Sequence, residues 1–186
     1  MVFIMINNTG CCGGNTKCCQ PQKTKKELVI DFLYLDLTVC ERCQGADSNL
    51  DGAIKDVSHV LNAAGYDVRV NKVNISSEEM AKEYKFLSSP TIRINGVDIA
   101  LDIKESECKE CGDLCGDSID CRVWEYEGIE YAEPPKEMII NAILKAVYGG
   151  QSVSQPSQME YTVPENLKVF FAGVKNNPHS AYKKGV

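Results

Sequence analysis

Cysteine is the residue type in this chain most able to do chemistry, and its ten cysteines fall into three clusters. Thiolates attack disulfides and bind soft metal ions, so closely spaced cysteines indicate redox or metal chemistry. The clusters are, in chain order, Cys11, Cys12, Cys18 and Cys19; then Cys40 and Cys43; then Cys108, Cys111, Cys115 and Cys121. We therefore expect up to three thiol sites.

The middle cluster is the dithiol motif Cys40-Glu41-Arg42-Cys43. A gap of two residues lets the sulfurs close a small disulfide ring or present two thiols together. A following helix N-terminus and the charge of Arg42 would both lower the pKa of Cys40 and raise its thiolate fraction. We predict that Cys40 is the attacking thiol and Cys43 the resolving thiol. The alternatives are half of a metal site, or two unreactive thiols.

The third cluster has the spacing C-x2-C-x3-C-x5-C over residues 108–121. Four thiolates so close in sequence could surround one tetrahedral zinc ion. They could also hold an iron–sulfur cluster, pair as disulfides, form a disulfide relay with Cys40, or stand as spare thiols in a loop. We predict a structural metal site or the relay, with Cys108, Cys111, Cys115 and Cys121 as ligands of the metal.

The first cluster consists of two adjacent cysteine pairs in a glycine-rich stretch. Soft thiolates select thiophilic metals and, by the same reasoning, trivalent metalloids. One hypothesis is a capture arm for such an ion, which could pass its cargo to Cys40 and Cys43. The alternative is a disordered arm that binds metal only adventitiously.

Hydrophobic periodicity predicts the elements that must position these cysteines. A strand apolar on both faces is expected over 28–37, directly before the dithiol, and is followed by a helix with an apolar stripe over 50–64. Ser48 and Asp51 leave open a later helix start, with the dithiol in a loop. The remaining expectations are a strand over 67–75, a helix opened by a Ser76–Glu79 capping box, a hairpin of 91–94 and 97–101 turning at Asn95-Gly96, and a helix from Pro134 or Pro135 to Gly149.

This order predicts an α/β domain, β-α-β-α-β-β-α, over residues 27–149, with an insertion over 104–133. The insertion begins cysteine-rich and is expected to end in a hairpin over 123–131 that turns at Glu127-Gly128. Residues 1–26 are expected to be a flexible arm, and residues 150–186 a linker with a short helix near Pro164. The apolar face of that helix could dock on a partner or back onto the domain.

The strand–CxxC–helix unit and the segment 84–96 (YKFLSSPTIRING) together resemble thioredoxins and glutaredoxins. The resemblance implies a cis-proline at Pro90 beside the dithiol, with Ser89, Pro90 and Thr91 on the substrate side. Val39 and Ser89 depart from residues usual in those families. The arrangement of all the cysteines is similar to an uncharacterised prokaryotic family of thioredoxin-like proteins, known only as a domain of unknown function (type 2703), which supplies no activity.

The function expected from these features is thiol–disulfide oxidoreduction on a protein or small-molecule disulfide, which needs no cofactor. The alternative is binding or transfer of a soft metal or metalloid, with zinc or another thiophilic metal as the ion. A net charge of −6 argues against nucleic acid, and no apolar run approaches the length of a membrane span. Without a recognisable export signal, we expect a cytoplasmic location.

Overall fold

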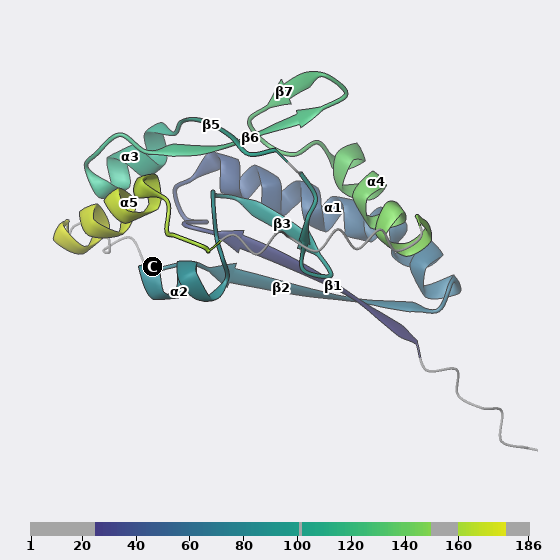
Figure 1. The fold of residues 1–186 in the computed structure, drawn as a ribbon. Helices are drawn as coiled ribbons and strands as arrows, with labels where there is room; N and C mark the ends of the chain where they lie inside the picture. The colour runs from purple at the N-terminus through teal and green to yellow at the C-terminus, as the bar shows by residue number, and fades with distance from the viewer. Residues whose placement is uncertain (1–24, 101, 150–159, 178–186) are drawn as a thin grey trace, which may run out of the picture.

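The computed structural model describes residues 25–100, 102–149 and 160–177. This part of the chain is a mixed α/β structure with two sheets and five helices (Figure 1). The predictions for Cys11, Cys12, Cys18 and Cys19 concern residues outside these ranges. Within them, no helix combines the length and apolarity that a bilayer span requires.

The first sheet has the strand order β2-β1-β3-β4, and its central strand β1 is parallel to β2 and antiparallel to β3. The β3–β4 turn is formed by Asn95 and Gly96, which have positive φ angles of 51° and 81°. The predicted Asn-Gly hairpin is therefore confirmed, although β4 is shorter than expected. The strands are β1 (Lys26–Tyr34), β2 (Tyr66–Asn74), β3 (Thr91–Ile94) and β4 (Val97–Asp98).

Three helices cover this sheet, with α1 and α4 packed together on one face and α2 on the other (Figure 1). Strand β1 alternates between the two faces: Ile30 and Phe32 join the core under α1, whereas Leu33 joins the core that contains the cysteines. This explains why its sequence is apolar on both faces. The helices are α1 (Glu41–Ala63), α2 (Glu78–Glu83) and α4 (Lys136–Tyr148).

Helix α1 begins immediately after Cys40, so the later start at Ser48 does not occur. The predicted capping box of Ser76 and Glu79 is wrong by one residue. The N-cap of α2 is Ser77, whose side chain accepts from the backbone N–H of Met80. The dithiol therefore lies at a helix N-terminus.

The second sheet belongs to the insertion and has the order β5-β6-β7. The predicted hairpin is present, and it turns at Glu127 and Gly128 with positive φ. Strand β5 and helix α3 were not predicted, because both are short and mostly polar. These elements are β5 (Lys104–Glu107), α3 (Lys109–Cys115), β6 (Asp120–Tyr126) and β7 (Ile129–Tyr131).

Helix α5 (Glu165–Asn176) lies beside α3 at one end of the first sheet (Figure 1). Its side chains Leu167 and Phe170 are buried in the same core as the cysteines. Gly173 lies so close to Cys115 that an added Cβ would approach the Cys115 carbonyl oxygen to 2.4 Å. The apolar face of α5 thus packs on the chain's own insertion.

Candidate metal centre

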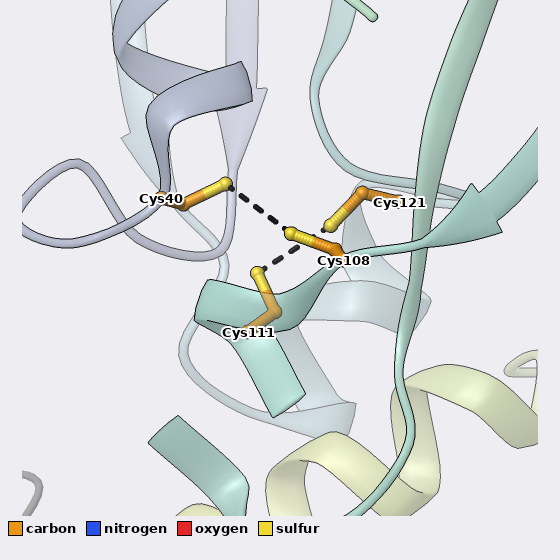
Figure 2. A group of neighbouring side chains, drawn as sticks. All are labelled: Cys40, Cys108, Cys111 and Cys121. Atoms are coloured by element: carbon orange, nitrogen blue, oxygen red, sulfur yellow. Dashed lines mark hydrogen bonds between the residues drawn. The ribbon is translucent and has the colours of Figure 1, made fainter. Parts of the chain in front are cut away.

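Four buried cysteine sulfurs meet between the first helix and the insertion. The Sγ atoms of Cys40, Cys108, Cys111 and Cys121 all lie within 4.8 Å of one another, and the four side chains point toward a common centre (Figure 2). None of the six cysteines in the described part of the chain forms a disulfide. The group therefore consists of free sulfur donors.

Each sulfur reaches the centre from a defined backbone position. Cys40 is the N-cap of α1, Cys108 is the N-cap of α3, and Cys111 lies in the first turn of α3. Cys108 and Cys111 are three residues apart, a spacing that places side chains on one helix face. Cys121 lies on β6, and the pairing of β5 with β6 brings it close to Cys108. The Cys108 N–H also donates to the Ile119 carbonyl oxygen at 2.8 Å.

The sulfur separations agree with a single tetrahedral ion. Zinc–thiolate bonds of about 2.3 Å place tetrahedral sulfurs about 3.8 Å apart. The Sγ atoms of Cys40 and Cys108 are 4.0 Å apart, and those of Cys111 and Cys121 are 3.4 Å apart. An iron–sulfur cluster binds its cysteines through different irons and so spreads the sulfurs farther than ligands of one ion.

Burial and contact between the thiols shift the pKa values of the four cysteines in different directions. Cys40, Cys111 and Cys121 are 0% exposed and Cys108 is 1% exposed. Hydrogen bonds from neighbouring thiols, that of Cys108 above all, lower the pKa of Cys40. The hydrogen bond with Cys108 raises the pKa of Cys111. Four thiolates this close together repel one another, so without a cation some of them must stay protonated. A bound metal cation would offset the negative charge and allow all four thiols to lose their protons.

Arg42, within the dithiol motif, joins α1 to the insertion. Its guanidinium donates to the carbonyl oxygens of Glu107 at 2.7 Å, Ser106 at 3.1 Å and Cys121 at 3.2 Å. Glu107 immediately precedes Cys108. The side chain expected to act by its charge on Cys40 therefore fixes the backbone at two other cysteines of the group.

The second thiol of the motif lies beside the group but outside it. Cys43 is 0% exposed, and its Sγ lies 3.4 Å from the hydroxyl of Ser89. Contact with Cys40 and burial raise the pKa of Cys43. The Ser89–Pro90 peptide bond is cis, which confirms that prediction.

The three residues predicted to face a substrate are covered by the chain itself. Ser89, Pro90 and Thr91 are buried. The Ser89 carbonyl oxygen accepts from the Arg122 N–H at 2.7 Å, and the Thr91 hydroxyl accepts from the Arg122 guanidinium at 3.0 Å. Strand β6 of the insertion thus pairs with residues that the thioredoxin resemblance places on the substrate side.

Cys115, placed by spacing with the third cluster, lies at the end of α3 and outside the four-sulfur group. Its Sγ donates to the carbonyl oxygens of Gly112 and Asp117, each at 3.7 Å. Burial raises its pKa. The structure thus brings together Cys108, Cys111 and Cys121, and the fourth sulfur comes from Cys40.

Sequence reasoning linked Cys40 to the third cluster only as a possible disulfide relay and not as a ligand of the same metal as Cys121, because 80 residues separate the two cysteines in the chain. The signal that could have joined them is the alternative that Cys40 and Cys43 form half of a metal site, because a half-site needs further thiolates from elsewhere in the chain. No sequence pattern indicates the contacts of Arg42, because its partners are three backbone carbonyls and the Ser106 hydroxyl of a segment distant in sequence.

One family of proteins has a model that matches this chain. The model of a family described as a domain of unknown function, DUF2703, matches residues 28–143. No curated protein and no solved structure matches the chain. The matched range includes all four cysteines of the group.

Proposed function

Because this chain belongs to the DUF2703 family, whose description names no activity, we propose a function from its own geometry: it binds one thiophilic metal ion. The ligands are Cys40, Cys108, Cys111 and Cys121. The observation that carries the proposal is the convergence of these four buried sulfurs, all within 4.8 Å of one another. Sites built only from thiolates favour zinc and other soft or borderline metals.

The donor set indicates a closed centre. Four cysteine ligands fill the four positions of a tetrahedral ion, whereas catalytic zinc sites keep one position for water or substrate. An ion held here would have no free position for Lewis-acid chemistry. We therefore propose binding and structural cross-linking, rather than metal-catalysed hydrolysis, as the role of the site.

Local charges support an anionic centre. Four thiolates and one divalent cation leave a net charge of −2 in a buried place, which must be offset. The N-terminus of α1, a 23-residue helix, brings its partial positive charge to Cys40. The guanidinium of Arg42 lies against the Cys121 carbonyl. Both features lower the cost of burying this charge.

We further infer that the first sheet and its helices form a thioredoxin-like core. The order β2-β1-β3-β4, a dithiol at the start of α1 and the cis Ser89–Pro90 bond support this. In this interpretation a metal ion would join the first helix of the core to the insertion. Cys40, which corresponds to the attacking thiol of a thioredoxin, would then be one of its ligands.

Metal analysis of anaerobically purified protein tests the proposal. A full-length background with Cys11→Ser, Cys12→Ser, Cys18→Ser and Cys19→Ser isolates the described cysteines. We expect one zinc per chain in this background and in Cys115→Ser, and loss of tight binding in Cys121→Ser. Cobalt should give the absorption of a tetrahedral all-thiolate site.

Three outcomes would overturn the metal proposal. One is no uptake of zinc, cadmium, iron or arsenite. Another is equal binding by Cys121→Ser and the background. The third is loss of binding in Cys115→Ser while Cys40→Ser still binds, which would favour the ligand set predicted from spacing alone.

Thiol–disulfide oxidoreduction is the second candidate function. It is favoured by Cys43 lying next to Cys40 beside the cis Ser89–Pro90 bond. Complete burial of both thiols disfavours it, because a substrate disulfide must reach the attacking sulfur. Disulfide-reductase activity that is lost in Cys40→Ser would support this second function. Activity that survives Cys40→Ser would remove it.

A further inference from the structure

We propose that the metal centre is redox-controlled: oxidation joins Cys40 to Cys43 and thereby removes one ligand from the metal. The inference rests on the proposed metal site and assigns its regulation. The observation behind it is that Cys40 belongs to two thiol arrangements at once. It is a member of the four-sulfur group and the first residue of the CxxC pair.

Cys43 is placed to react with Cys40 without being a ligand itself. It lies three residues on, in the first turn of α1, and residues at this spacing have Cβ atoms about 5–6 Å apart. Disulfides need Cβ atoms about 3.5–4.5 Å apart, so a small shift at the N-cap suffices. The sulfur of Cys43 lies 3.4 Å from the Ser89 hydroxyl and beside Cys40, and it is not one of the four grouped sulfurs.

The number of ligands that each possible disulfide would remove from the metal favours oxidation of the Cys40–Cys43 pair. A disulfide between two members of the group, such as Cys111 and Cys121, would detach two thiolates from the ion. A disulfide between Cys40 and Cys43 detaches only one. Among the described cysteines outside the group, Cys115 has its Sγ directed at the carbonyl oxygens of Gly112 and Asp117. Cys43 is therefore the free thiol placed beside a ligand.

The oxidant is a small peroxide, since the thiols are buried and a protein disulfide cannot approach them. The Cys40 thiolate attacks one peroxide oxygen, the O–O bond breaks, and hydroxide leaves, which gives a sulfenic acid. The Cys43 thiol then attacks this sulfur; the S–S bond forms and water leaves. Two electrons pass from the two sulfurs to hydrogen peroxide, and the proton of Cys43 ends in the water.

Loss of Cys40 from the centre leaves three ligands, all on the insertion. Cys108, Cys111 and Cys121 would then hold the ion without any ligand from α1. The released coordination position is open to water or to a competing chelator. Oxidation would therefore convert a closed centre into one that gives up its metal, and a dithiol reductant would restore it.

The test uses the full-length background without the four N-terminal cysteines, loaded with zinc under anaerobic conditions. Hydrogen peroxide is added, released zinc is followed with a chromogenic chelator, and disulfides are mapped by mass spectrometry. We expect zinc release together with a Cys40–Cys43 disulfide, and rebinding after reduction. Cys43→Ser should load with zinc normally but release it roughly tenfold more slowly. Cys115→Ser is the matched control and should behave as the background does.

The outcomes separate this inference from the proposed function. Failure of the reduced background to load zinc would overturn the metal site itself. Normal loading, followed by equally fast release from Cys43→Ser, would overturn the switch and leave the metal site standing. So would a first disulfide between Cys111 and Cys121, or between Cys111 and Cys115.

Discussion

The guanidinium of Arg42 donates to the carbonyl oxygen of Glu107 at 2.7 Å, although 65 positions separate the two residues in the chain. Glu107 precedes Cys108, and Arg42 lies between Cys40 and Cys43. The bond therefore ties the first turn of α1 to the residue that leads into the third cysteine cluster. It is a hydrogen bond beside the proposed ligands rather than among them, and such contacts orient metal ligands.

Arg42→Lys should weaken zinc binding while the protein stays folded. A lysine ammonium is a point donor and cannot span the carbonyls of Ser106, Glu107 and Cys121 as the guanidinium does. Loss of contacts that orient ligands typically reduces metal affinity about 10–100-fold. Competition with a chelator of known affinity measures the change.

Arg69→Lys is the matched control for this change. Arg69 is an exposed residue of β2, with an ion-pair separation of 3.9 Å from Glu27. Zinc affinity should be unchanged in this variant. Equal zinc affinity of Arg42→Lys and the unsubstituted protein would show that the contacts of Arg42 with the insertion do not position the ligands.

Much of the first sheet could be predicted because its signals are local. The apolar run of β1, the Asn95-Gly96 turn and the repeat of Ile139 and Ile143 in α4 each fix one element within a few residues. Strand β5 and helix α3 carry no such signal. Their conformations depend on pairing with β6 and on packing against α5, which are contacts distant in sequence.

The candidate site could be predicted in part, for the same reason: local spacing indicates Cys108, Cys111 and Cys121, but not Cys40. Spacing correctly gathers cysteines that share a helix, such as Cys108 and Cys111. It fails for Cys115, because one more helical turn carries that side chain away from the centre, toward the Gly112 and Asp117 carbonyls. It also fails for Cys40, whose place in the group depends on how the insertion folds back on α1.

Gly173→Ala should destabilise the protein. A Cβ at this position would lie 2.4 Å from the Cys115 carbonyl oxygen and 2.7 Å from the Cys115 Cβ, so α5 must move away from α3. Overpacking of this kind costs about 1–3 kcal/mol in the free energy of unfolding. Denaturant unfolding followed by circular dichroism measures it.

The control for this change is Gly52→Ala in α1. Its Cβ would meet only the flexible Lys136 side chain, at 3.3 Å from Cδ. Alanine is favoured over glycine in a helix by about 1 kcal/mol, so this variant should be as stable as the parent or more stable. If both variants shift stability in the same direction by similar amounts, close packing at Gly173 is not the cause.

Asp98→Ala should cost about 3 kcal/mol, near the lower end of the range for breaking a buried ion pair. Arg122 is 0% exposed, and its guanidinium bonds the Asp98 carboxylate at 2.8 and 3.1 Å. The Asp98 side chain is 25% exposed, which moderates the loss. Removing the carboxylate leaves a buried cation over the ring of Trp124, beside the neutral Thr91 hydroxyl and Ala100 carbonyl.

A double variant separates the pair from simple loss of packing. Asp98→Ala combined with Arg122→Met removes the uncompensated charge and should recover part of the stability. Thermal and denaturant unfolding of the single and double variants give the coupling energy. Strictly additive losses would mean that Arg122 and Asp98 contribute independently.

Zinc should raise the midpoint of thermal unfolding, because its ligands come from both α1 and the insertion and converge only in the folded chain. At a free zinc concentration of 100 times Kd, linkage gives about 2.7 kcal/mol. For a chain of this size that corresponds to about 5–10 °C. Scans with zinc and with a chelator, in the background lacking the four N-terminal cysteines, measure the shift. Cys115→Ser should keep the shift and Cys121→Ser should lose it, whereas the same rise in Cys121→Ser would place the stabilising zinc at other ligands.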